Sequence, residues 1–246
     1  MKTEWDYSER AANYDKRADY SEEALSELIK KLKLSETQRV ADIGAGTGKL
    51  TKKLLDFGLV VDAIEPNDSM RFLGQKNTVG RNVNWIEAVA ENTGLQRAEY
   101  HGVFFGSSFN VVDQTSTLKE VARLLVSNGW FACLWNHRDL KDPVQKNIEK
   151  IICRYIPNYQ YGSRREDPSE IIVRSGLFGK IDKIEKKFIM PMKKPDIVAA
   201  WKSHETLSRQ AGEKFDQIIE EISYNLTLEK YNVPYYTRIW FSRLKN

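Results

Sequence analysis

The residues of this sequence that are best suited to chemistry lie in a glycine-rich turn. Val40–Ile43 is a mostly apolar run, Gly44-Ala45-Gly46-Thr47-Gly48 follows it, and Lys49 opens a stretch with helical character. Glycine tolerates a positive φ and lets the backbone approach a ligand closely. The N–H groups at a helix N-terminus attract an acidic ligand group. The pattern therefore predicts a strand, a tight turn and a helix start, with a nucleotide-type cofactor held by the turn.

The spacing of the glycines and the nearby acids separates two classes of nucleotide cofactor. Dinucleotide-binding turns read G-x-G-x-x-G, whereas here Gly48 comes one residue too early for that pattern. Asp42 would repel a pyrophosphate, but its charge attracts an amine or a sulfonium. Glu65 ends a second apolar run about 20 residues past the turn, where an acid can bind both hydroxyls of a ribose. A solvated loop acid is the alternative for Glu65.

Residues 42–48 resemble motif I, D-x-G-x-G-x-G, of the class I S-adenosylmethionine-dependent methyltransferases. The chain looks like the small-molecule enzymes of the methyltransferase type 11 group, which includes trans-aconitate methyltransferase, over residues 10–140 by motif and over the rest by layout. The resemblance implies S-adenosyl-L-methionine as the cofactor and S-adenosyl-L-homocysteine as the product. It also implies in-line transfer of a methyl group to an O or N atom, in preference to a C atom, of a small-molecule acceptor.

The resemblance extends to further positions around the cofactor. Ala12-x-Tyr14-x-x-Arg17 is similar to the N-terminal lid over the cofactor's carboxylate; a surface helix with aromatic anchors is the alternative. Relatives carry an aspartate where Val89 stands in the adenine-binding loop, so Glu91 or the backbone at Ala90 would replace it, unless this is a plain loop. The cofactor-binding residues that we expect are Tyr14, Arg17, Asp42, Gly44, Ala45, Gly46, Thr47, Gly48, Glu65, Pro66, Asn67, Met70, Ala90, Glu91, Gly106, Ser107 and Ser108.

The substrate side of the site is expected where two strands end. Residues 107–113 look like the family's motif beside the methyl-transfer centre, and a strand at 130–135 delivers His137 next to it. His137 is a candidate general base with an ordinary pKa of about 6.5; a loop histidine satisfied by Asp139 is the alternative. The other histidines are placed differently, because His101 begins a strand, where relatives have an aspartate, and His204 is expected in a helix far along the cap.

Basic and aromatic side chains complete the expected substrate site. The Arg164-Arg165 pair is suited to an acidic substrate, and a solvated basic loop is the alternative. The substrate-binding residues that we expect are Tyr20, Phe109, Trp135, Asn136, Arg138, Tyr161, Arg164 and Arg165.

Strand-like apolar runs alternate with helical patterns along the chain, the first helix beginning at Ser21. The expected strands are 40–43, 59–64, 83–88, 102–105, 130–135, 180–192 and 235–241. This alternation predicts an α/β fold, and the resemblance makes it a doubly wound, mostly parallel seven-stranded Rossmann-like sheet with a helical cap. The expected parts are a lid and helix in 1–34, a cofactor-binding core in 35–139, a cap insertion in 140–178, and the end of the core in 179–246.

The composition limits the possible partners. The chain has 246 residues, 38 basic and 34 acidic, and its net charge of +4 is too mild for a nucleic-acid-binding protein. Cys133 and Cys153 are too few for a disulfide framework or a tetrahedral zinc site. The sequence shows neither a signal peptide nor a run of about 18 apolar residues. We therefore expect a cytoplasmic monomer or homodimer that acts on a small molecule, without metal, nucleic acid or membrane.

Two other functions are compatible with the sequence. One is a methyltransferase that acts on RNA or protein, which would need a basic face or an added binding domain. The other is a non-catalytic S-adenosylmethionine-binding protein, which a turnover assay would separate from an enzyme.

Overall fold

The inner strands of the central sheet are formed by apolar runs that are buried on both faces. The computed structural model describes residues 11–162 and 165–245. Its sheet has the order β3-β2-β1-β4-β5-β7-β6, in which the first five strands are parallel and β7 is antiparallel to both neighbours. The strands are β1 (Arg39–Ile43), β2 (Val60–Ile64), β3 (Val83–Ile86), β4 (Tyr100–Gly106), β5 (Leu125–Arg138), β6 (Phe178–Lys193) and β7 (Lys230–Leu244). The predicted doubly wound, mostly parallel seven-stranded sheet is confirmed.

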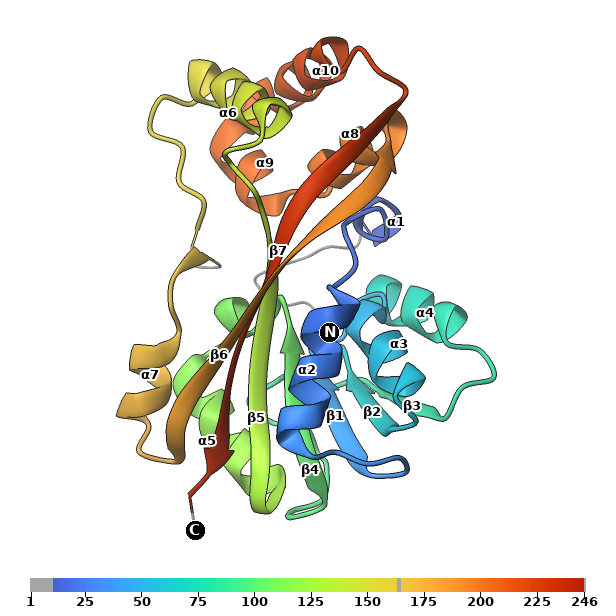
Figure 1. Ribbon diagram of the computed structural model, residues 1–246, viewed down its shortest axis with the longest axis vertical. Helices are drawn as coiled ribbons and strands as arrows, with labels where there is room; N and C mark the ends of the chain where they lie inside the picture. The colour runs from blue at the N-terminus through green and yellow to red at the C-terminus, as the bar shows by residue number, and fades with distance from the viewer. Residues whose placement is uncertain (1–10, 163–164, 246) are drawn as a thin grey trace.

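Helices cover both faces of this sheet (Figure 1). Helices α2 (Glu22–Leu32) and α3 (Lys49–Asp56) pack on the face that includes Phe104 and Leu134, whereas α5 (Gln114–Leu124) and α7 (Ser169–Arg174) pack on the face that includes Phe105 and Cys133. Neighbouring strand residues therefore serve opposite faces, as the strand period of two requires. The other helices are α1 (Ala11–Tyr14), α4 (Asp68–Asn77), α6 (Pro143–Tyr155), α8 (Lys194–Lys202), α9 (Glu205–Ala211) and α10 (Phe215–Asn225), with 3-10 turns at Phe109–Val111 and Gly212–Lys214.

The start of α2 follows its sequence closely. Ser21 precedes the helix, and its Oγ accepts a hydrogen bond from Ala24 N at 3.2 Å. This bond satisfies one of the free N–H groups at the helix start, as the predicted N-cap requires. Across the described residues, no helix combines the length and the apolar character needed to span a bilayer.

β6 and β7 form a long ribbon that extends beyond the other strands and supports the cap (Figure 1). Helices α6, α8, α9 and α10 gather at its outer end around their own apolar cluster. Residues 140–178, expected as one cap insertion, are divided by the structure. Helix α6 belongs to the cap, whereas α7 packs through Ile172 into the core of the sheet. Both are short amphipathic helices, so their own sequences do not show which surface they cover.

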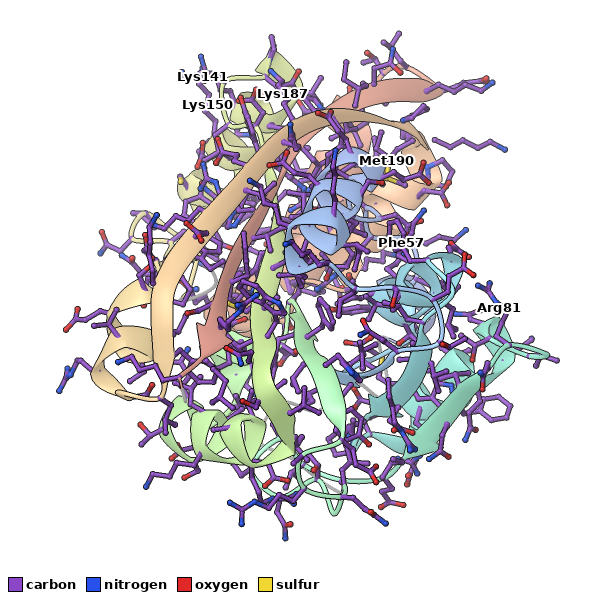
Figure 2. The ribbon with its side chains drawn as sticks, turned by 60° about the horizontal axis from the view of Figure 1, so that its bottom comes forward. Phe57, Arg81, Lys141, Lys150, Lys187 and Met190 are labelled. Carbon is purple, nitrogen blue, oxygen red and sulfur yellow. The ribbon has the colours of Figure 1, made fainter. Side chains whose placement is uncertain are left out.

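An ion pair fixes the cap to the ribbon where β5 ends. Lys187 Nζ on β6 lies 2.8 Å from Asp139 Oδ2. Asp139 Oδ1 accepts a hydrogen bond from Lys141 N at 2.9 Å, which supports the turn into α6. Lys141 and Lys187, which both contact Asp139, are labelled at this corner of the molecule in Figure 2.

One indole ring supports both the glycine turn and helix α4. Trp85 on β3 donates through Nε1 to Thr78 Oγ1 at 3.0 Å. A Cβ atom added to Gly48 would lie 3.2 Å from the ring, and one added to Gly74 on α4 would overlap it. Gly74 is therefore needed because α4 packs with its backbone directly against Trp85.

We predict that Gly74→Ala destabilises the protein although alanine is the better helix former. The added methyl group must displace the indole of Trp85, and such overpacking costs about 1–3 kcal/mol, more than the ~1 kcal/mol of helix propensity that alanine offers. Urea unfolding measures the difference. Gly179→Ala on β6 is the control, because its Cβ would have Arg243 O as its nearest neighbour at 3.6 Å. Equal stability of Gly74→Ala and wild type would show that Trp85 moves aside freely.

Candidate functional site

The glycine turn lies at the carboxyl end of β1, where the strand order reverses. β1 pairs with β2 on one side and with β4 on the other, and open α/β sheets bind ligands at such a point. Gly44 N and Ala45 N both donate to Ile64 O, at 2.8 and 3.0 Å. Gly44 has a φ of +68°, and a Cβ there would lie 2.5 Å from Ser108 Cβ. Both the backbone conformation and the close packing therefore require glycine at this position.

Glu65, directly after β2, holds the turn from the opposite side. Its Oε2 accepts from Gly46 N and its Oε1 from Asn67 N, each at 2.8 Å. The side chain is buried, and this burial raises the pKa of Glu65, while the two amide donors and Arg71 oppose the rise. Each carboxylate oxygen has a second lone pair. Glu65 can therefore fasten the turn and still accept two hydroxyl groups from a ligand.

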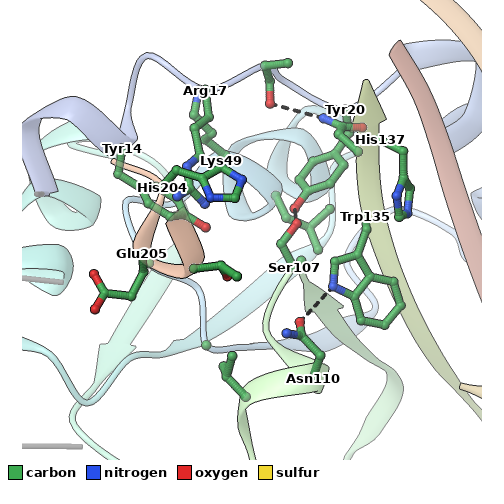
Figure 3. A pocket seen from close by; sticks show the side chains of 18 of the residues that line it. Tyr14, Arg17, Tyr20, Lys49, Ser107, Asn110, Trp135, His137, His204 and Glu205 are labelled. Atoms are coloured by element: carbon green, nitrogen blue, oxygen red, sulfur yellow. Dashed lines mark hydrogen bonds between the residues drawn. The ribbon is translucent and has the colours of Figure 1, made fainter. Parts of the chain in front are cut away.

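Two cavities meet at the turn. The sheet-end cavity, of about 500 Å³, extends from Glu65 past residues 88–91 to Asp113. The cap cavity, of about 260 Å³, lies between the turn, residues 14–20, the end of β5 and the cap (Figure 3). The residues that line both are Tyr14, Gly44, Gly46, Ser107, Asn110 and Val111. A ligand that passes the turn would therefore have one part in each cavity.

The far end of the sheet-end cavity is a mostly apolar slot. It is lined by Ala88–Ala90 from the loop after β3 and by Val111 and Val112 from the loop after β4. Glu91 stands at the rim, where its Oε1 accepts from Asp113 N at 2.8 Å. Val89 offers no polar side chain, so Glu91 is the acid of this loop at the cavity. The slot suits a flat ring with a polar edge.

Most of the predicted cofactor residues meet at these two cavities. Those that line them are Tyr14, Arg17, Asp42, Gly44, Ala45, Gly46, Thr47, Glu65, Pro66, Met70, Ala90, Glu91, Gly106, Ser107 and Ser108. Gly48 and Asn67, which were also predicted to bind the cofactor, line neither cavity. Gly48 packs against Trp85, and Asn67 Oδ1 accepts from Met70 N at 3.0 Å to cap helix α4. Both residues support the site because each lies where a loop passes into a helix.

Residues 13–20 cover the turn in the position expected of the lid. Arg17 joins this segment to the cap, since its Nε donates to Ser203 Oγ at 2.8 Å and its Nη2 to Ser203 O at 2.5 Å. Asn136 Nδ2 joins it to β5 through two main-chain oxygens, at 2.8 and 3.1 Å. Lid, sheet and cap are thus connected around the cap cavity. Residues 1–10 lie outside the described part of the chain.

Two hydrogen-bonded side-chain pairs stand near the junction of the cavities (Figure 3). Tyr20 OH lies 3.0 Å from Ser107 Oγ, and Trp135 Nε1 donates to Asn110 Oδ1 at 2.9 Å. Ser107 has a φ of +63°, which is uncommon for a residue with a side chain. Burial raises the pKa of Tyr20 far above its usual range. Its phenol therefore stays protonated and works as an uncharged hydrogen-bonding group.

The predicted substrate residues are mostly brought together, with one error. Those that line the cap cavity are Tyr20, Trp135, Asn136, Arg138, Tyr161 and Arg165. Arg164 lies outside the described residues. The prediction for Phe109 is wrong, because its ring is fully buried against Phe105 and Phe131, with ring centres 5.3 and 5.2 Å away. The 3-10 turn that begins at Phe109 directs this residue into the core and Asn110 to both cavities.

His137 lies in the wall of the cap cavity and is buried. Its role as a base stays a prediction. Asp139, the alternative partner suggested by the sequence, accepts from Lys187 Nζ at 2.8 Å and from Tyr236 OH at 3.5 Å. The carboxylate of Asp139 therefore stabilises the β6–β7 ribbon.

The cap cavity also contains residues that the sequence did not single out. The expectation that His204 lies far from the site is wrong, because it lines this cavity and stacks on Trp201 with ring centres 5.1 Å apart. Lys49 lines the same cavity, and its Nζ pairs with Asp19 Oδ1 at 3.0 Å. The further residues of this kind are Ala18, Leu50, Gly162, Glu205, Thr206 and Tyr235. No local pattern points to residues 204–206, since only the folding back of the cap brings them to the sheet.

A metal centre is not apparent in this region. Within residues 11–162 and 165–245, no group of three or more His, Cys, Asp or Glu side chains is arranged to hold a metal ion.

Comparisons of sequence find similarities in the first part of the chain. Residues 41–133 match the family model described as a methyltransferase domain. An uncharacterized methyltransferase of Mycobacterium tuberculosis is 31% identical over 138 residues, which are 56% of this chain and 54% of that protein. One of Schizosaccharomyces pombe is 27% identical over 140 residues, which are 56% of this chain and 55% of that protein. The chain thus spans about half the length of the curated relatives it matches.

Comparisons of structure identify the fold over nearly the whole chain. YcgJ of Bacillus subtilis is similar with a TM-score of 0.56 and 17% identity, over 92% of this chain and 99% of that one. Phosphoethanolamine N-methyltransferase 2 of Haemonchus contortus, solved with S-adenosyl-L-methionine, gives a TM-score of 0.57 and 16% identity, over 96% of this chain and 57% of that one. At such identities the likeness shows the fold alone, which is the Rossmann-like methyltransferase fold.

Asp42, two residues before the turn, is a fully buried acid beside the cap cavity. Its Oδ2 accepts from Thr51 Oγ1 at 2.6 Å, whereas its Oδ1 has no hydrogen-bond partner among the described residues. Burial raises the pKa of Asp42 to about 7; the hydrogen bond from Thr51 opposes this rise, and the charge of Glu65 adds to it. A buried acceptor without a donor calls for an explanation, and a cationic ligand group would satisfy it.

We predict that Asp42 lowers the stability of the wild type as the pH rises. The folded-state pKa of Asp42 lies above that of an unfolded aspartate, so between about pH 4 and 7 the folded state binds this proton more often than the unfolded state does. The free energy of unfolding of the wild type therefore falls as the pH rises through this window. Asp42→Asn has no proton to lose there. Its free energy of unfolding relative to wild type should therefore increase by roughly 2 kcal/mol between pH 5 and pH 8. Urea unfolding at both pH values measures it, and a difference independent of pH would contradict the raised pKa.

Proposed function

We propose that this protein, which carries a methyltransferase domain in residues 41–133 and has the fold of the class I S-adenosylmethionine-dependent methyltransferases, is an enzyme that methylates a small molecule. Its cofactor is S-adenosyl-L-methionine and its product is S-adenosyl-L-homocysteine. One observation carries the proposal: the carboxylate of Glu65 is bound to the glycine turn at the edge of two connected cavities.

The sheet-end cavity fits the adenosine part of this cofactor. Glu65 accepts the two ribose hydroxyls through the lone pairs that its amide donors leave available. The slot formed by Ala88–Ala90, Val111 and Val112 takes the adenine ring, and Glu91 meets the polar edge of that ring. Glu91 thus takes the place of the aspartate that relatives carry at the position of Val89.

The cap cavity fits the amino-acid part. Asp42 Oδ1, the buried acceptor without a donor, takes the ammonium group. Arg17, held in place by Ser203, provides positive charge for the carboxylate. Asp42 disfavours NAD, because its carboxylate beside the glycine turn would repel a pyrophosphate bound there.

When bound, S-adenosylmethionine supplies a methyl group on a positively charged sulfur that needs no further activation. The residues of the chain therefore mainly align the acceptor, which can contribute about 7–11 kcal/mol. The Tyr20–Ser107 and Trp135–Asn110 pairs fix the walls of the junction where the acceptor must lie. The lid and the cap shield this region from water. His137 lies in the same cavity and would take a proton from an acceptor that carries one.

The size and enclosure of the cap cavity favour a small acceptor over a polymer. Its volume is about 260 Å³, and it is bounded by the lid on one side and the cap on the other. An RNA or protein substrate would need an open groove in place of this cover. The acceptor atom is O or N, the atoms that a small acid, phenol or amine presents.

The cofactor assignment is tested by calorimetry. We predict that S-adenosylmethionine and S-adenosylhomocysteine bind and that NAD does not. Glu65→Ala should weaken the binding of S-adenosylmethionine by roughly 1–3 kcal/mol, because a charged hydrogen-bond partner of the ribose is lost. Since Glu65 also fastens Gly46, Glu65→Gln is the second variant. It keeps one acceptor oxygen and should lose less affinity for S-adenosylmethionine than Glu65→Ala does.

Glu99→Ala is the matched control for the loss of an acid. Glu99 pairs with Arg39 at the amino ends of β4 and β1, whereas the turn follows the carboxyl end of β1. Circular dichroism checks that each variant is folded. Stronger binding of NAD than of S-adenosylmethionine would overturn the proposed function, and unchanged affinity in Glu65→Ala would remove Glu65 from the ribose site.

A second experiment concerns His137. Small acids, phenols and amines are first screened as acceptors by the formation of S-adenosylhomocysteine. If His137 removes a proton from the acceptor, His137→Ala should lower turnover by ~10²–10⁴ and leave the affinity for S-adenosylmethionine intact. A rise in KM with turnover kept would instead show that His137 only orients the acceptor.

A further inference from the structure

Two arginine side chains lie in the wall of the cap cavity. Arg138, the last residue of β5, and Arg165, in the loop before α7, both line this cavity and a small hollow of about 20 Å³ beside it. Within the part of the chain that the structure describes, neither guanidinium forms an ion pair with a carboxylate. Both belong to the cap side of the site and not to the sheet-end cavity.

Aromatic rings fix the orientation of both guanidinium groups. Arg138 Cζ lies 4.0 Å from the ring centre of Trp201, and Arg165 Cζ lies 3.8 Å from that of Tyr161. Tyr161 is in turn held edge-on against Tyr159, with ring centres 5.2 Å apart. Stacking uses the flat face of a guanidinium and leaves the N–H groups at its edge for hydrogen bonding. The two arginines are therefore arranged as donors.

The charges around these arginines leave the cavity wall positive. The pKa of Arg165 is lowered by its burial and by the nearby charge of Arg138, against a smaller opposite effect of Glu149. Glu205, which also lines the cavity, is paired with Arg209 Nε at 2.9 Å. Asp42 lies next to the glycine turn. Two cations in the wall of one partly buried cavity favour the binding of an anion.

We infer that the methyl acceptor is a small organic anion, whose carboxylate or phosphate group binds Arg138 and Arg165 while its nucleophilic atom lies at the junction beside Tyr20 and Trp135. Arginine suits both groups, because paired N–H donors match two oxygens of either anion. The inference rests on the proposed function and adds the class of the substrate. Arg138 and Arg165 are both among the predicted substrate residues, and the structure places them in one cavity wall.

The experiment measures acceptor turnover and anion binding separately. Purified protein is saturated with S-adenosylhomocysteine and titrated with succinate and with inorganic phosphate, which serve as probes of the arginine pair and distinguish the two anion types. In parallel, small carboxylic acids, phosphomonoesters, neutral phenols and neutral alcohols are compared as acceptors. We expect turnover only with anionic acceptors and measurable binding of at least one probe.

Variants then locate the anion site. Arg165→Gln and Arg138→Gln should each raise the KM of the anionic acceptor, and the Kd of the probe, by roughly tenfold or more, with the affinity for S-adenosylmethionine unchanged. Arg165→Lys should recover part of the loss, because it restores the charge without the paired donors. Arg154→Gln is the matched control, since Arg154 pairs with Glu221 on the outer side of the cap. Thermal unfolding shows which variants are folded. If Arg138→Gln does not fold, Arg165→Gln alone tests the anion site.

The outcomes are distinct from those of the cofactor test. Turnover of neutral acceptors by wild type and Arg165→Gln alike would overturn the anion site while the methyltransferase assignment stands. Weaker S-adenosylmethionine binding in Arg138→Gln or Arg165→Gln would overturn it too, because the pair would then hold the carboxylate of the cofactor. Failure of both probes to bind would have the same consequence.

Discussion

The whole site depends on two backbone hydrogen bonds to one buried carboxylate. Gly46 N and Asn67 N donate to the two oxygens of Glu65, which joins the turn after β1 to the start of α4. Burying a carboxylate is costly unless it is hydrogen-bonded, and these amides cannot move unless the neighbouring strands move. The turn, the helix start and the acceptors for a ligand diol are therefore held in one arrangement before any ligand binds.

The charges of the site are separated along its length. The buried acids Asp42 and Glu65 lie next to the glycine turn, whereas Arg138 at the end of β5 and Arg165 in the loop before α7 lie in the wall of the cap cavity. Between them lie uncharged hydrogen-bonded groups such as Tyr20. This order suits a reaction between a cationic methyl donor and an anionic acceptor, because each end attracts one of them and the middle attracts neither.

Lid and cap connect the two ends of this arrangement. Arg17 links residues 13–20 to Ser203 in the cap, and Asn136 links the same residues to β5. Asn136 Oδ1 also accepts from Thr237 Oγ1 on β7 at 2.6 Å, which brings the ribbon into the same network. The cap cavity is thus enclosed by segments from both ends of the chain, although its floor is the parallel sheet that the first half of the sequence forms.

The sequence by itself determined the strand, turn and helix around Gly44, the position of the acid Glu65 at the end of β2, and the N-cap of α2 at Ser21. Each depends on residues within one strand–loop–helix unit, where periodicity, glycine and capping side chains act on their own neighbours. Only the tertiary structure decided that Phe109 is core while Asn110 lines the cavities, that His204 lines the cap cavity, and that Arg138 and Arg165 share one cavity wall. A 3-10 turn separates Phe109 from Asn110, and the packing of the cap on the β6–β7 ribbon brings His204 to the cavity. Such contacts join residues far apart in the chain, so their geometry is not encoded in any local pattern.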